Sequence, residues 1–536
     1  MTYRSRVPSA PRLPLWAAGL VAVAAGLLTD LAFPAVGWWW CAPLGVAALV
    51  IALGGRRGWA AAGVGLLYGL AFMLTHLQWS GVYVGPVWLA LAALEAAFFA
   101  VLGPLVALVH RASGRPVVQA LGVGGAWVAV EALRARIPFG GFGWGRLAFS
   151  QADAPTLGLA AIGGAPLLTF AVGVSGALLA TVALDVSRRP RAATGPAVAA
   201  VVVLLAGLAV PTPTAAEEGS VRVAAVQGDV PRPGLKFNAE RRAVLDNHVA
   251  ATLDLAEAVE QGDEPAPDLV FWPENASDID PLRNDDAAAA IDRAADAVGV
   301  PILVGTLLGS DRDDSVRNVT LVWDPETGPG ERYVKRHPVP FGEYVPYREF
   351  FRRITDKVDL VRSDMVGGDE VGLLAPAGVA VGVLICFEVV DDDLVGDVAR
   401  AGAEIITVQT NNATFGYTDE SVQQLAMSRV RAVEHGRAVV HVSTVGVSAL
   451  IAPDGEVLTS GGHFTREVLT GDLPRRTSLN VATVLGAWGE AALAAVGVLV
   501  AVLALTRRRP QLHDHDDVHD HDDVHDHGVG ERGRGG

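Results

Sequence analysis

Cysteine is nearly absent from this chain, which has only Cys41 and Cys386 among its 536 residues. Two cysteines are too few for a disulfide framework or for a metal site built from thiolates. Charged residues are also scarce, at 19% of the chain, whereas hydrophobic residues make up 51%. Such a chain is too apolar to be one soluble globular protein of this length. Basic residues are not in excess, since the net charge is −16, which argues against nucleic-acid binding.

The hydrophobic residues are gathered in two parts of the chain, on either side of a region of ordinary composition at 220–474. A helix needs about 20 apolar residues to cross the hydrocarbon of a membrane. Segments near this length or longer predict eight membrane-spanning helices. They lie at residues 15–33, 36–54, 58–79, 86–110, 117–135, 157–186, 194–212 and 480–506. Asp30 and Pro34 interrupt the first two segments. We therefore expect a multi-pass membrane protein.

These segments divide the chain into four regions. They are an N-terminal membrane bundle of seven helices at 1–212, a domain of ordinary soluble composition at 213–479, a C-terminal transmembrane helix at 480–506 and a tail at 507–536. The tail alternates six histidines with seven aspartates between His513 and His527. This composition is typical of a solvated, disordered segment, and it is also suited to binding divalent metal ions. Both interpretations of the tail stay open.

Arginines in the short loops indicate the orientation of the chain, because basic loops stay in the cytoplasm. They precede the first span and follow the second, fourth, sixth and eighth, at Arg4, Arg6, Arg12, Arg56, Arg57, Arg111, Arg115, Arg188, Arg189, Arg191 and Arg507 to Arg509. Arg134, Arg136 and Arg146, near the end of the fifth span, depart from this alternation. The pattern places both termini in the cytoplasm. It places residues 213–479 on the extracytoplasmic face of the cell membrane.

Between the apolar regions, short β-branched runs alternate with amphipathic segments. Strands are predicted at 221–227, 269–272, 301–308, 318–323, 379–385, 404–409, 439–443 and 449–451, and helices at 239–261, 285–297 and 420–435. Many short strands with few helices between them favour two packed sheets with helices outside. The predicted fold class is therefore an α-helical membrane bundle joined to an α/β domain.

Cys386 stands at the end of one of these predicted strands, and Glu274 and Lys335 also stand at or near strand ends. A nucleophilic thiol needs a base to take its proton and a cation to stabilise the oxyanion that its attack creates. Glutamate and lysine supply these roles. A lone cysteine more often packs as a small hydrophobic residue, which is how we interpret Cys41. We predict that Cys386 is the nucleophile, Glu274 the base and Lys335 the oxyanion stabiliser.

The order of Glu274, Lys335 and Cys386, with the motifs Trp-Pro-Glu and Cys-Phe-Glu, resembles the nitrilase superfamily. Such a domain between an N-terminal bundle and a final helix resembles the apolipoprotein N-acyltransferases. The resemblance is also carried by Gln227–Pro231, Lys236–Phe237, Lys335–Pro346, Asn411–Gly416, Arg429–Arg437, Glu131–Arg134, Phe142–Trp144 and Ser150–Gln151. It implies that the extracytoplasmic domain is a nitrilase-like α-β-β-α sandwich that forms an acyl-enzyme on Cys386.

The chain departs from the family pattern at three places. Phe387 stands where the family usually has tyrosine. Residues 411–416 read Asn-Asn-Ala-Thr-Phe-Gly instead of Asn-Asp-Ala-Trp-Phe-Gly, and residues 443–446 lack an asparagine. None of these changes touches the three predicted catalytic residues, but they leave the details of substrate binding open.

The resemblance implies that the chain moves a fatty acyl group from a membrane phospholipid to the α-amino group of the diacylglyceryl-cysteine that begins a lipoprotein. A thioester preserves the energy of the acyl bond, so the reaction needs neither a metal nor another cofactor. The expected partners are a phospholipid donor and a diacylated lipoprotein acceptor, and we expect a membrane-embedded monomer.

Two alternative functions remain. One is a membrane-tethered amidase of the nitrilase type, which would use the same residues with water as the acceptor. The other is a transporter or receptor whose extracytoplasmic domain only binds a ligand. That class expects charged residues at mid-membrane, where the predicted spans offer little beyond Asp30, Glu95 and Glu131.

The resemblance also suggests residues around the site. It implies a supporting role for Glu343, eight residues after Lys335. Glu388 is expected to face the opposite side of its strand, in a supporting role that is either structural or functional. Tyr344, Phe341 and Phe415 are predicted to bind substrate as part of a lid over the acyl chain, with ordinary loop packing as the alternative.

Two further groups are interpreted as structural. Arg431 and Glu434, three residues apart on a predicted helix, are expected to form an ion pair. Trp79, Phe142 and Trp144 are expected to anchor the bundle at the membrane interface or to pack within it.

Overall fold

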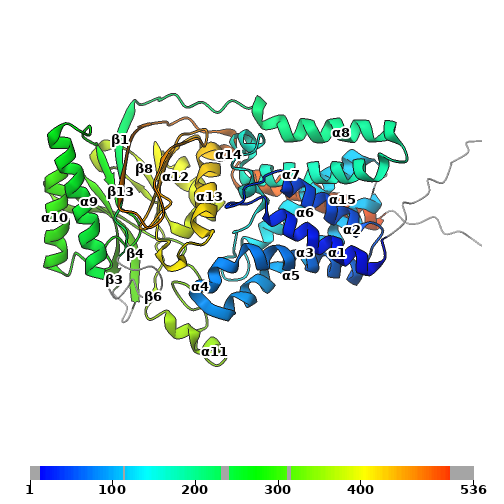
Figure 1. Cartoon of the computed structure of the whole chain (residues 1–536), viewed down its shortest axis with the longest axis horizontal. Helices are drawn as coiled ribbons and strands as arrows, with labels where there is room; N and C mark the ends of the chain where they lie inside the picture. Colours follow the sequence, from blue (N-terminus) through cyan, green and yellow to red (C-terminus); the bar gives the residue numbers. More distant parts are fainter. Residues whose placement is uncertain (1–12, 113–114, 231–240, 311–314, 507–536) are drawn as a thin grey trace, which may run out of the picture.

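The computed structural model describes residues 13–112, 115–230, 241–310 and 315–506. Long helices pack side by side in one half of the molecule, and sheets with their covering helices form the other half (Figure 1). The predictions for Arg4, Arg6 and Arg12, for Lys236–Phe237 and for residues 507–536 lie outside the described residues.

Within the described residues, the helical half is built from segments that the hydropathy pattern predicts, together with one short helix, α4, between the third and fourth predicted spans. They are α1 (Leu15–Asp30), α2 (Cys41–Leu53), α3 (Gly58–His76), α4 (Gly81–Val84), α5 (Trp88–Ala112), α6 (Pro116–Arg134), α7 (Ala160–Asp185), α8 (Pro190–Leu205) and α15 (Ala487–Thr506). Six segments are long and apolar enough to cross a membrane: Gly58–His76, Gln78–Ala112, Pro116–Arg134, Leu157–Asp185, Pro190–Ala209 and Ala487–Thr506. The helices α1 and α2 are shorter, with 16 and 13 residues.

The last predicted span, 480–506, is not one helix. It divides into α14 (Val481–Leu485) and α15 at Gly486, whose φ of 50° lies in the left-handed region that ends a helix. Hydropathy alone does not reveal this break, because both pieces are apolar. The break lets α14 lie against the catalytic half while α15 packs on α6 and α5.

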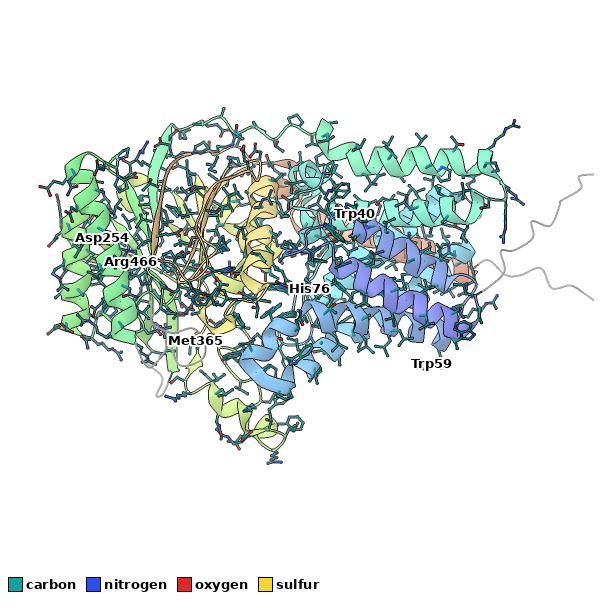
Figure 2. The ribbon with its side chains drawn as sticks, viewed as in Figure 1. Trp40, Trp59, His76, Asp254, Met365 and Arg466 are labelled. Carbon is teal, nitrogen blue, oxygen red and sulfur yellow. The ribbon has the colours of Figure 1, made fainter. Side chains whose placement is uncertain are left out.

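The helix α3 shows which end of the bundle faces the sheets. Trp59, near its start, is 93% exposed at the end of the bundle away from the sheets, and His76, its last residue, lies toward them (Figure 2). His76 Nδ1 is 3.0 Å from Asp30 Oδ1, so the last residues of α1 and α3 are paired at this end.

The other half contains two sheets. The first has the order β13-β1-β2-β3-β4-β5, with β6 added beside β4. Its strands are β1 (Ser220–Gln227), β2 (Leu269–Phe271), β3 (Ile302–Gly309), β4 (Ser315–Asp324), β5 (Gly328–Val334), β6 (Asp364–Met365) and β13 (Glu467–Pro474). The strands β1, β2 and β3 run parallel to one another, whereas β4 and β5 continue the sheet as antiparallel strands.

The second sheet has the order β12-β11-β10-β9-β8-β7. Its strands are β7 (Leu373–Leu374), β8 (Val381–Ile385), β9 (Ile405–Thr410), β10 (Ala438–Ser443), β11 (Ala449–Ile451) and β12 (Val457–Ser460). The three central strands, β8, β9 and β10, run parallel and are buried along their whole length. Their carboxyl ends therefore meet at one edge of the sheet.

Helices cover the outer faces of the two sheets. The first sheet is covered by α9 (Arg241–Gln261) and α10 (Asp285–Val298), and the second by α12 (Asp392–Arg400) and α13 (Glu420–His435). One apolar layer joins the two sheets, and it includes Val223, Phe271, Val383 and Val440. The predicted fold class, a helical membrane bundle with a nitrilase-like α-β-β-α sandwich, is confirmed.

Two helices of this half, α10 and α13, have ends that their sequences favour. Asn284 caps α10 by accepting a hydrogen bond from the Ala287 N–H, and Gly299 ends the helix in the left-handed conformation. Gly436 ends α13 in the same way. The sequence pattern does not predict α12, a short helix with charged residues whose first turn is capped by the Asp391 side chain.

One hydrophobic core extends from the bundle into the sandwich. It contains Trp127 and Leu168 of the bundle together with Val430 of α13 and Val408 of β9. The helix α13 lies between the second sheet and α7, so it has apolar contacts on both sides. This shared core fixes the position of the catalytic half relative to the bundle.

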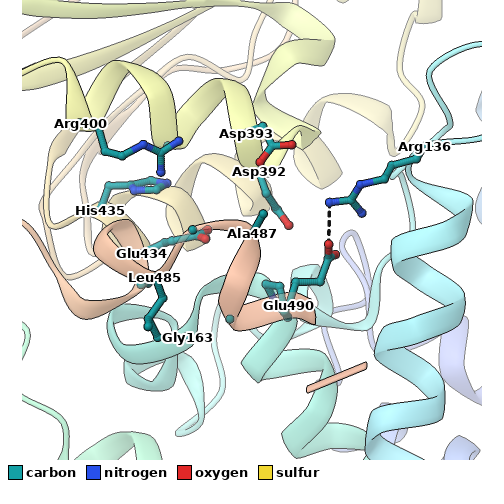
Figure 3. Close-up of a pocket in the computed structure, with 15 residues that line it drawn as sticks. Arg136, Gly163, Asp392, Asp393, Arg400, Glu434, His435, Leu485, Ala487 and Glu490 are labelled. Carbon is teal, nitrogen blue, oxygen red and sulfur yellow. Dashed lines mark ion pairs between the residues drawn. The ribbon is translucent and has the colours of Figure 1, made fainter. Parts of the chain in front are cut away.

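Ion pairs reinforce this junction, which Figure 3 shows from one side. Arg136 pairs with Glu490 of α15 at 2.6 Å. Asp392, the first residue of α12, receives Arg146 Nη1 and Arg431 Nη2, both at 2.7 Å. The charges therefore connect the loop after α6, the final helix and two helices of the sandwich.

The same contacts explain the arginines that depart from the basic-loop pattern. Arg134 pairs with Glu95 of α5 at 2.9 Å, while Arg136 and Arg146 belong to the junction. All three have a structural role at the end of the bundle that meets the sandwich. The predicted pair of Arg431 and Glu434 is confirmed, with a distance of 2.5 Å.

Candidate active site

Three strand ends bring the predicted catalytic residues together. Glu274 follows β2 by three residues, Lys335 comes directly after β5, and Cys386 comes directly after β8. Cys386 has a φ of 54°, in the left-handed region that residues other than glycine seldom adopt. The chain turns sharply at the cysteine, from β8 into the short 3-10 segment Cys386–Val390. The chain therefore leaves the line of the strand at the cysteine. Local backbone strain of this kind is often found at functional sites.

Lys335 lies between two carboxylates. Its Nζ is 2.7 Å from Glu343 Oε1 and 3.4 Å from Glu274 Oε1. Asn318 Nδ2 of β4 donates to the same two carboxylates, at 2.7 Å to Glu274 and 3.3 Å to Glu343. Glu274 is also close enough to Cys386 for its negative charge to raise the pKa of the thiol. The structure therefore assembles the predicted glutamate, lysine and cysteine and adds Glu343 as a second partner of the lysine.

The position of Glu274 is held by both sheets. Thr444, after β10, donates to the Glu274 carbonyl at 3.0 Å, and Gln409 Nε2 of β9 donates to the neighbouring Trp272 carbonyl at 2.5 Å. Gly305 of β3 makes room for this segment, because a Cβ there would lie 2.1 Å from the Pro273 carbonyl oxygen. Any larger residue at 305 would push the base away from the thiol.

Burial and charge shift the pKa values of the three groups. Burial raises the pKa of the Cys386 thiol, and the negative charge of Glu274 raises it further. Burial also raises the pKa of Glu274, although Lys335 acts in the opposite direction. For Lys335 burial alone would lower the pKa, but Glu343 and Glu274 outweigh it and the pKa is raised. These directions favour a protonated thiol and a charged ammonium group in the resting site.

Glu388 has a structural position that the sequence does not predict. It lies in the 3-10 segment after β8, not on the strand, and it is fully buried. Its carboxylate accepts hydrogen bonds from the Arg336 N–H at 2.7 Å, the Tyr333 hydroxyl at 2.9 Å and the Ile385 N–H at 2.8 Å. It thereby fastens the chain before Cys386 to the chain on either side of Lys335. Its supporting role stays a prediction, and its contacts favour a positioning function.

Aromatic residues of the membrane half contact the segment that carries the nucleophile. Phe387 stacks on Phe142 at 5.2 Å and on Trp144 at 5.9 Å between ring centroids. Trp144 is 1% exposed and donates through Nε1 to Gln423 of α13 at 2.7 Å. Trp79 packs edge-on against Phe415 at 5.0 Å. Both tryptophans are buried, so of the two interpretations, an anchor at the membrane interface or packing, the structure favours packing, and their partners include residues of the sandwich.

The three residues predicted to bind substrate lie in different surroundings. Tyr344 lines a cavity of about 750 Å³, which is also lined by Phe139, Arg336, Met365 and Phe387. Phe341 packs against Phe351 at 4.9 Å and Phe139 at 5.8 Å, and Phe415 packs against Trp79. The cavity reaches from the membrane half to the residue beside Cys386. That any of the three binds substrate stays a prediction.

Sequence reasoning does not single out several residues that complete the site. Asn318, Thr410 and Gln424 contact the carboxylates or the thiol, and no motif points to them. Thr410 carries a usable signal, because it ends a buried parallel strand next to the one that ends at Cys386. Gln424 carries none, since a glutamine on a helix face gives no indication of what it contacts.

Family comparisons match both halves of the chain. Residues 25–178 match the apolipoprotein N-acyltransferase N-terminal domain, and residues 222–481 match the carbon-nitrogen hydrolase domain. An apolipoprotein N-acyltransferase of Mycolicibacterium smegmatis is 41% identical over 90% of this chain and 84% of the relative. One from Azotobacter vinelandii is 33% identical over 93% of this chain and 96% of the relative. The chain belongs to the apolipoprotein N-acyltransferase family.

Among solved structures, an amidase from Nesterenkonia sp. AN1 is similar at a TM-score of 0.35 and 20% identity, covering 48% of this chain and 93% of the amidase. The resemblance predicted from the motifs is confirmed by the family matches. As a member of the apolipoprotein N-acyltransferase family, the chain is an acyltransferase with a carbon-nitrogen hydrolase domain. Its apolar helices and its family make it a multi-pass membrane protein.

Proposed function

We propose that this acyltransferase moves a fatty acyl chain from a membrane phospholipid to the α-amino group of the diacylglyceryl-cysteine that begins a lipoprotein, through a thioester on Cys386. The observation that carries the proposal is the position of the thiol. Cys386 lies beside the Glu274–Lys335 pair, and its neighbour Phe387 stacks on Phe142 and Trp144 of the membrane half. These contacts support a nucleophile and a base that act on lipid substrates.

The first half-reaction forms the thioester. Glu274 takes the thiol proton, and Sγ attacks the ester carbonyl of the phospholipid. The carbonyl oxygen becomes an oxyanion, which the Lys335 ammonium stabilises. The carbon–oxygen bond to the lysophospholipid then breaks, and the proton held by Glu274 passes to the departing oxygen. Because the pKa of Glu274 is raised, this carboxyl group is suited to holding a proton for part of the cycle.

The second half-reaction uses the same residues in reverse. The neutral α-amino group of the acceptor attacks the thioester carbonyl, and Glu274 takes the proton that the nitrogen loses. The carbon–sulfur bond breaks, and the proton returns to Sγ. Lys335 stabilises the oxyanion in both halves. Glu343 stabilises the position of Lys335, because its Oε1 lies 2.7 Å from the ammonium and its Oε2 accepts the Val339 N–H at 2.6 Å.

The cavity between the two halves provides room for the lipid substrates. It has a volume of about 750 Å³, and Phe139, Tyr344 and Phe387 contribute aromatic side chains to its walls. Tyr83 of α4 donates to the Gly342 carbonyl at 3.1 Å, so the loop that carries Phe341 and Tyr344 is tied to the membrane half. We infer that the acyl chain approaches Cys386 along this loop.

The alternative functions have less support. A membrane-tethered amidase would use the same catalytic residues, but the aromatic contacts between Phe387 and the bundle favour a lipid substrate. A transporter or receptor expects charged groups that are available within the bundle. Asp30, Glu95 and Glu131 instead contact His76, Arg134 and Thr169.

A transfer assay tests the proposed function. The full-length protein in phospholipid vesicles is supplied with a synthetic peptide that begins with diacylglyceryl-cysteine, and the peptide is analysed by mass spectrometry. We expect a mass gain of one acyl chain on the α-amino group. Cys386→Ala should transfer nothing, whereas Cys41→Ala should behave like the parent. Hydrolysis of soluble amides in the absence of lipid, without acylation of the peptide, would favour the amidase instead.

We also propose that the catalytic domain lies on the extracytoplasmic face of the cell membrane, where lipoproteins are exposed. The arginine-rich loops support this orientation. Reporter fusions after residues 213 and 479 should read extracytoplasmic, and those after residues 56, 113, 190 and 510 should read cytoplasmic. A cytoplasmic reading for 213 and 479 would separate the enzyme from its proposed acceptors and contradict the assignment.

A further inference from the structure

The thiol of Cys386 has a second set of polar neighbours, apart from Glu274 and Lys335. Thr410 Oγ1, at the end of β9, lies 3.4 Å from Sγ. Gln424 Nε2, on α13, lies 3.6 Å from Sγ. Both side chains are fully buried, and they approach the sulfur from the second sheet and its covering helix. Neither residue takes part in the proton transfers or in the stabilisation of the substrate oxyanion.

A chain of hydrogen bonds determines which end of the Gln424 amide faces the sulfur. Gln424 Oε1 accepts from Thr410 Oγ1 at 2.7 Å and from Asn412 Nδ2 at 3.0 Å. With its oxygen occupied by these two donors, the amide presents its N–H group to Sγ. The Asn412 orientation is fixed in turn, because its Oδ1 accepts from Ser443 Oγ at 2.6 Å. The bonds run in one direction, from Ser443 through Asn412 and Gln424 to the thiol.

Three titratable groups around the thiol determine how unfavourable a negative charge on the sulfur is, and the two hydrogen-bond donors act against that cost. Glu274 faces Sγ from the end of β2, Lys335 from the end of β5, and Glu420 from the first turn of α13. Glu420 is buried and accepts from Asn412 Nδ2 at 2.6 Å. Burial raises the pKa of Glu420 to about 8. Two carboxyl groups and one ammonium therefore surround a sulfur that must carry a negative charge during the reaction.

We propose that Thr410 and Gln424 are further catalytic residues, which donate hydrogen bonds to Cys386 Sγ whenever it is a thiolate, and that Asn412 and Ser443 are positioning residues that orient Gln424. The single hydrogen of the Thr410 hydroxyl is donated to Gln424 Oε1 while the thiol is protonated and turns to Sγ when the thiolate forms, and Asn412 Nδ2 then holds Gln424 Oε1 alone. This inference rests on the proposed thioester mechanism and adds to it. The Lys335 side of the site stabilises charge on the substrate oxygen. The Thr410 side stabilises charge on the sulfur.

The thiolate occurs twice in the cycle. In the first half-reaction it exists after the thiol proton has moved to a Glu274 oxygen and before the new carbon–sulfur bond is complete. In the second, the electron pair of the breaking carbon–sulfur bond returns to Sγ, while Glu274 holds the proton from the amine. Hydrogen bonds to a charged acceptor are about twice as strong as those between neutral groups. The two donors therefore contribute most at these two points and least while the thioester is intact.

The same geometry provides a reason for one departure from the family pattern. Asn412 stands where the family usually has an aspartate. An asparagine uses its two N–H groups for Glu420 and Gln424, which a carboxylate at this position could not do. In this chain the asparagine thus connects a buried carboxyl group to the amide that faces the thiol.

The test measures the ionisation of Cys386 directly, without a lipid substrate. The full-length protein in a Cys41→Ala background is freed of acyl groups with neutral hydroxylamine, and the rate of alkylation by iodoacetamide is followed across pH. Cys386 is partly accessible to such a reagent, although burial and the charge of Glu274 raise its pKa. Because only the thiolate reacts, the profile gives the apparent pKa of the thiol.

Thr410→Val and Gln424→Met should each raise this apparent pKa by about one unit, which is about a tenfold slower alkylation at a fixed pH below it. Thr410→Ser keeps the hydroxyl and should match the parent. Ser443→Ala should cause a smaller rise in the same direction, since it only loosens the orientation of Asn412. The two main variants lie on different elements, so a folding failure in one leaves the other to decide.

Thr407→Val is the matched control, because Thr407 lies on the same strand and donates to the Val440 carbonyl at 3.2 Å, away from the thiol. It should lower thermal stability and leave the pKa of Cys386 unchanged. An unchanged pKa in folded Thr410→Val and Gln424→Met would overturn the inference. If the parent also formed no thioester and transferred no acyl chain, the proposed function itself would be wrong. If the parent transferred normally, the proposed function would stand, and only the role of Thr410 and Gln424 would be wrong.

Discussion

Two carboxylates, one at the junction with the bundle and one in the active site, show how this enzyme uses charge. Asp392, at the junction with the bundle, forms ion pairs with both Arg146 and Arg431. Glu274, in the site, shares the single cation Lys335 with Glu343. One carboxylate therefore lies between two cations, whereas two carboxylates surround one cation at the catalytic centre.

The two arrangements shift the pKa values in opposite directions. Burial would raise the pKa of Asp392, but its two arginines outweigh burial and hold the pKa below its usual value. Burial raises the pKa of Glu274, and the single lysine shared with Glu343 does not cancel the effect. The junction carboxylate thus stays ionised and holds the structure together. The catalytic carboxylate is able to exchange a proton.

The largest effect is expected from a substitution of the catalytic carboxylate, with the junction carboxylate as its control. Glu274→Gln should abolish acylation of Cys386 and leave the fold intact, because an amide cannot accept the thiol proton. Acyl-enzyme formation by mass spectrometry and a thermal unfolding curve measure the two properties. Asp392→Asn is the matched control and should lower stability while folded protein still acylates. Near-normal turnover in Glu274→Gln would mean that the base has been misassigned.

Lys335→Ala tests the cation that the two site carboxylates share. It should lower the rate of acyl transfer by about 10²–10³, the usual cost of losing one oxyanion donor. The measurement is the initial rate of transfer to the diacylglyceryl peptide. A loss of less than about tenfold would indicate that another group stabilises the oxyanion.

Arg431→Met tests the ion pairs at the junction between the sandwich and the bundle. The substitution removes a cation from Asp392 and Glu434 and removes donors from the Val389 and Val390 carbonyls. Breaking a buried ion pair costs about 3–5 kcal/mol, so we expect a large fall in the free energy of unfolding. Protein that remains folded should still form the acyl-enzyme. Unchanged stability would show that the junction charges contribute little.

The smallest effect is expected where the same substitution is made at the surface. Arg466 pairs with Asp254 at 2.6 Å, but the two side chains are 48% and 61% exposed (Figure 2). Solvent screens such pairs, so Arg466→Met should change the free energy of unfolding by less than about 1 kcal/mol. Equal losses from Arg431→Met and Arg466→Met would show that burial does not decide how much an arginine ion pair contributes to stability.

Much of the fold can be predicted, because hydrophobic patterning reports burial directly. The segment at 285–297 forms α10 and the run at 404–409 forms β9, each within a residue or so of its predicted ends. The pattern fails where a single backbone torsion decides the structure, as at Gly486 in the last apolar segment. It also misses α12, whose nine residues are too few and too charged to form a clear apolar stripe.

Part of the site is also predictable, because some of its residues stand out in the sequence by their type and position. Glu274, Lys335 and Cys386 are unusual residues at strand ends, and their order along the chain is informative. Thr410 and Gln424 are ordinary residues whose importance comes from the fold, since α13 brings Gln424 to the sulfur from 38 positions away. The pattern places Glu388 on the strand, because its turn into a 3-10 segment depends on the unusual φ of Cys386.

The most direct test is the covalent intermediate. The enzyme purified with its lipids but without a lipoprotein acceptor should accumulate one fatty acyl group on the peptide that contains Cys386, because no amine is present to resolve the thioester. The adduct should disappear with neutral hydroxylamine, and a diacylglyceryl-cysteine peptide should discharge it to form an amide-linked chain. An acyl group on Cys41, or transfer by Cys386→Ala, would contradict the account.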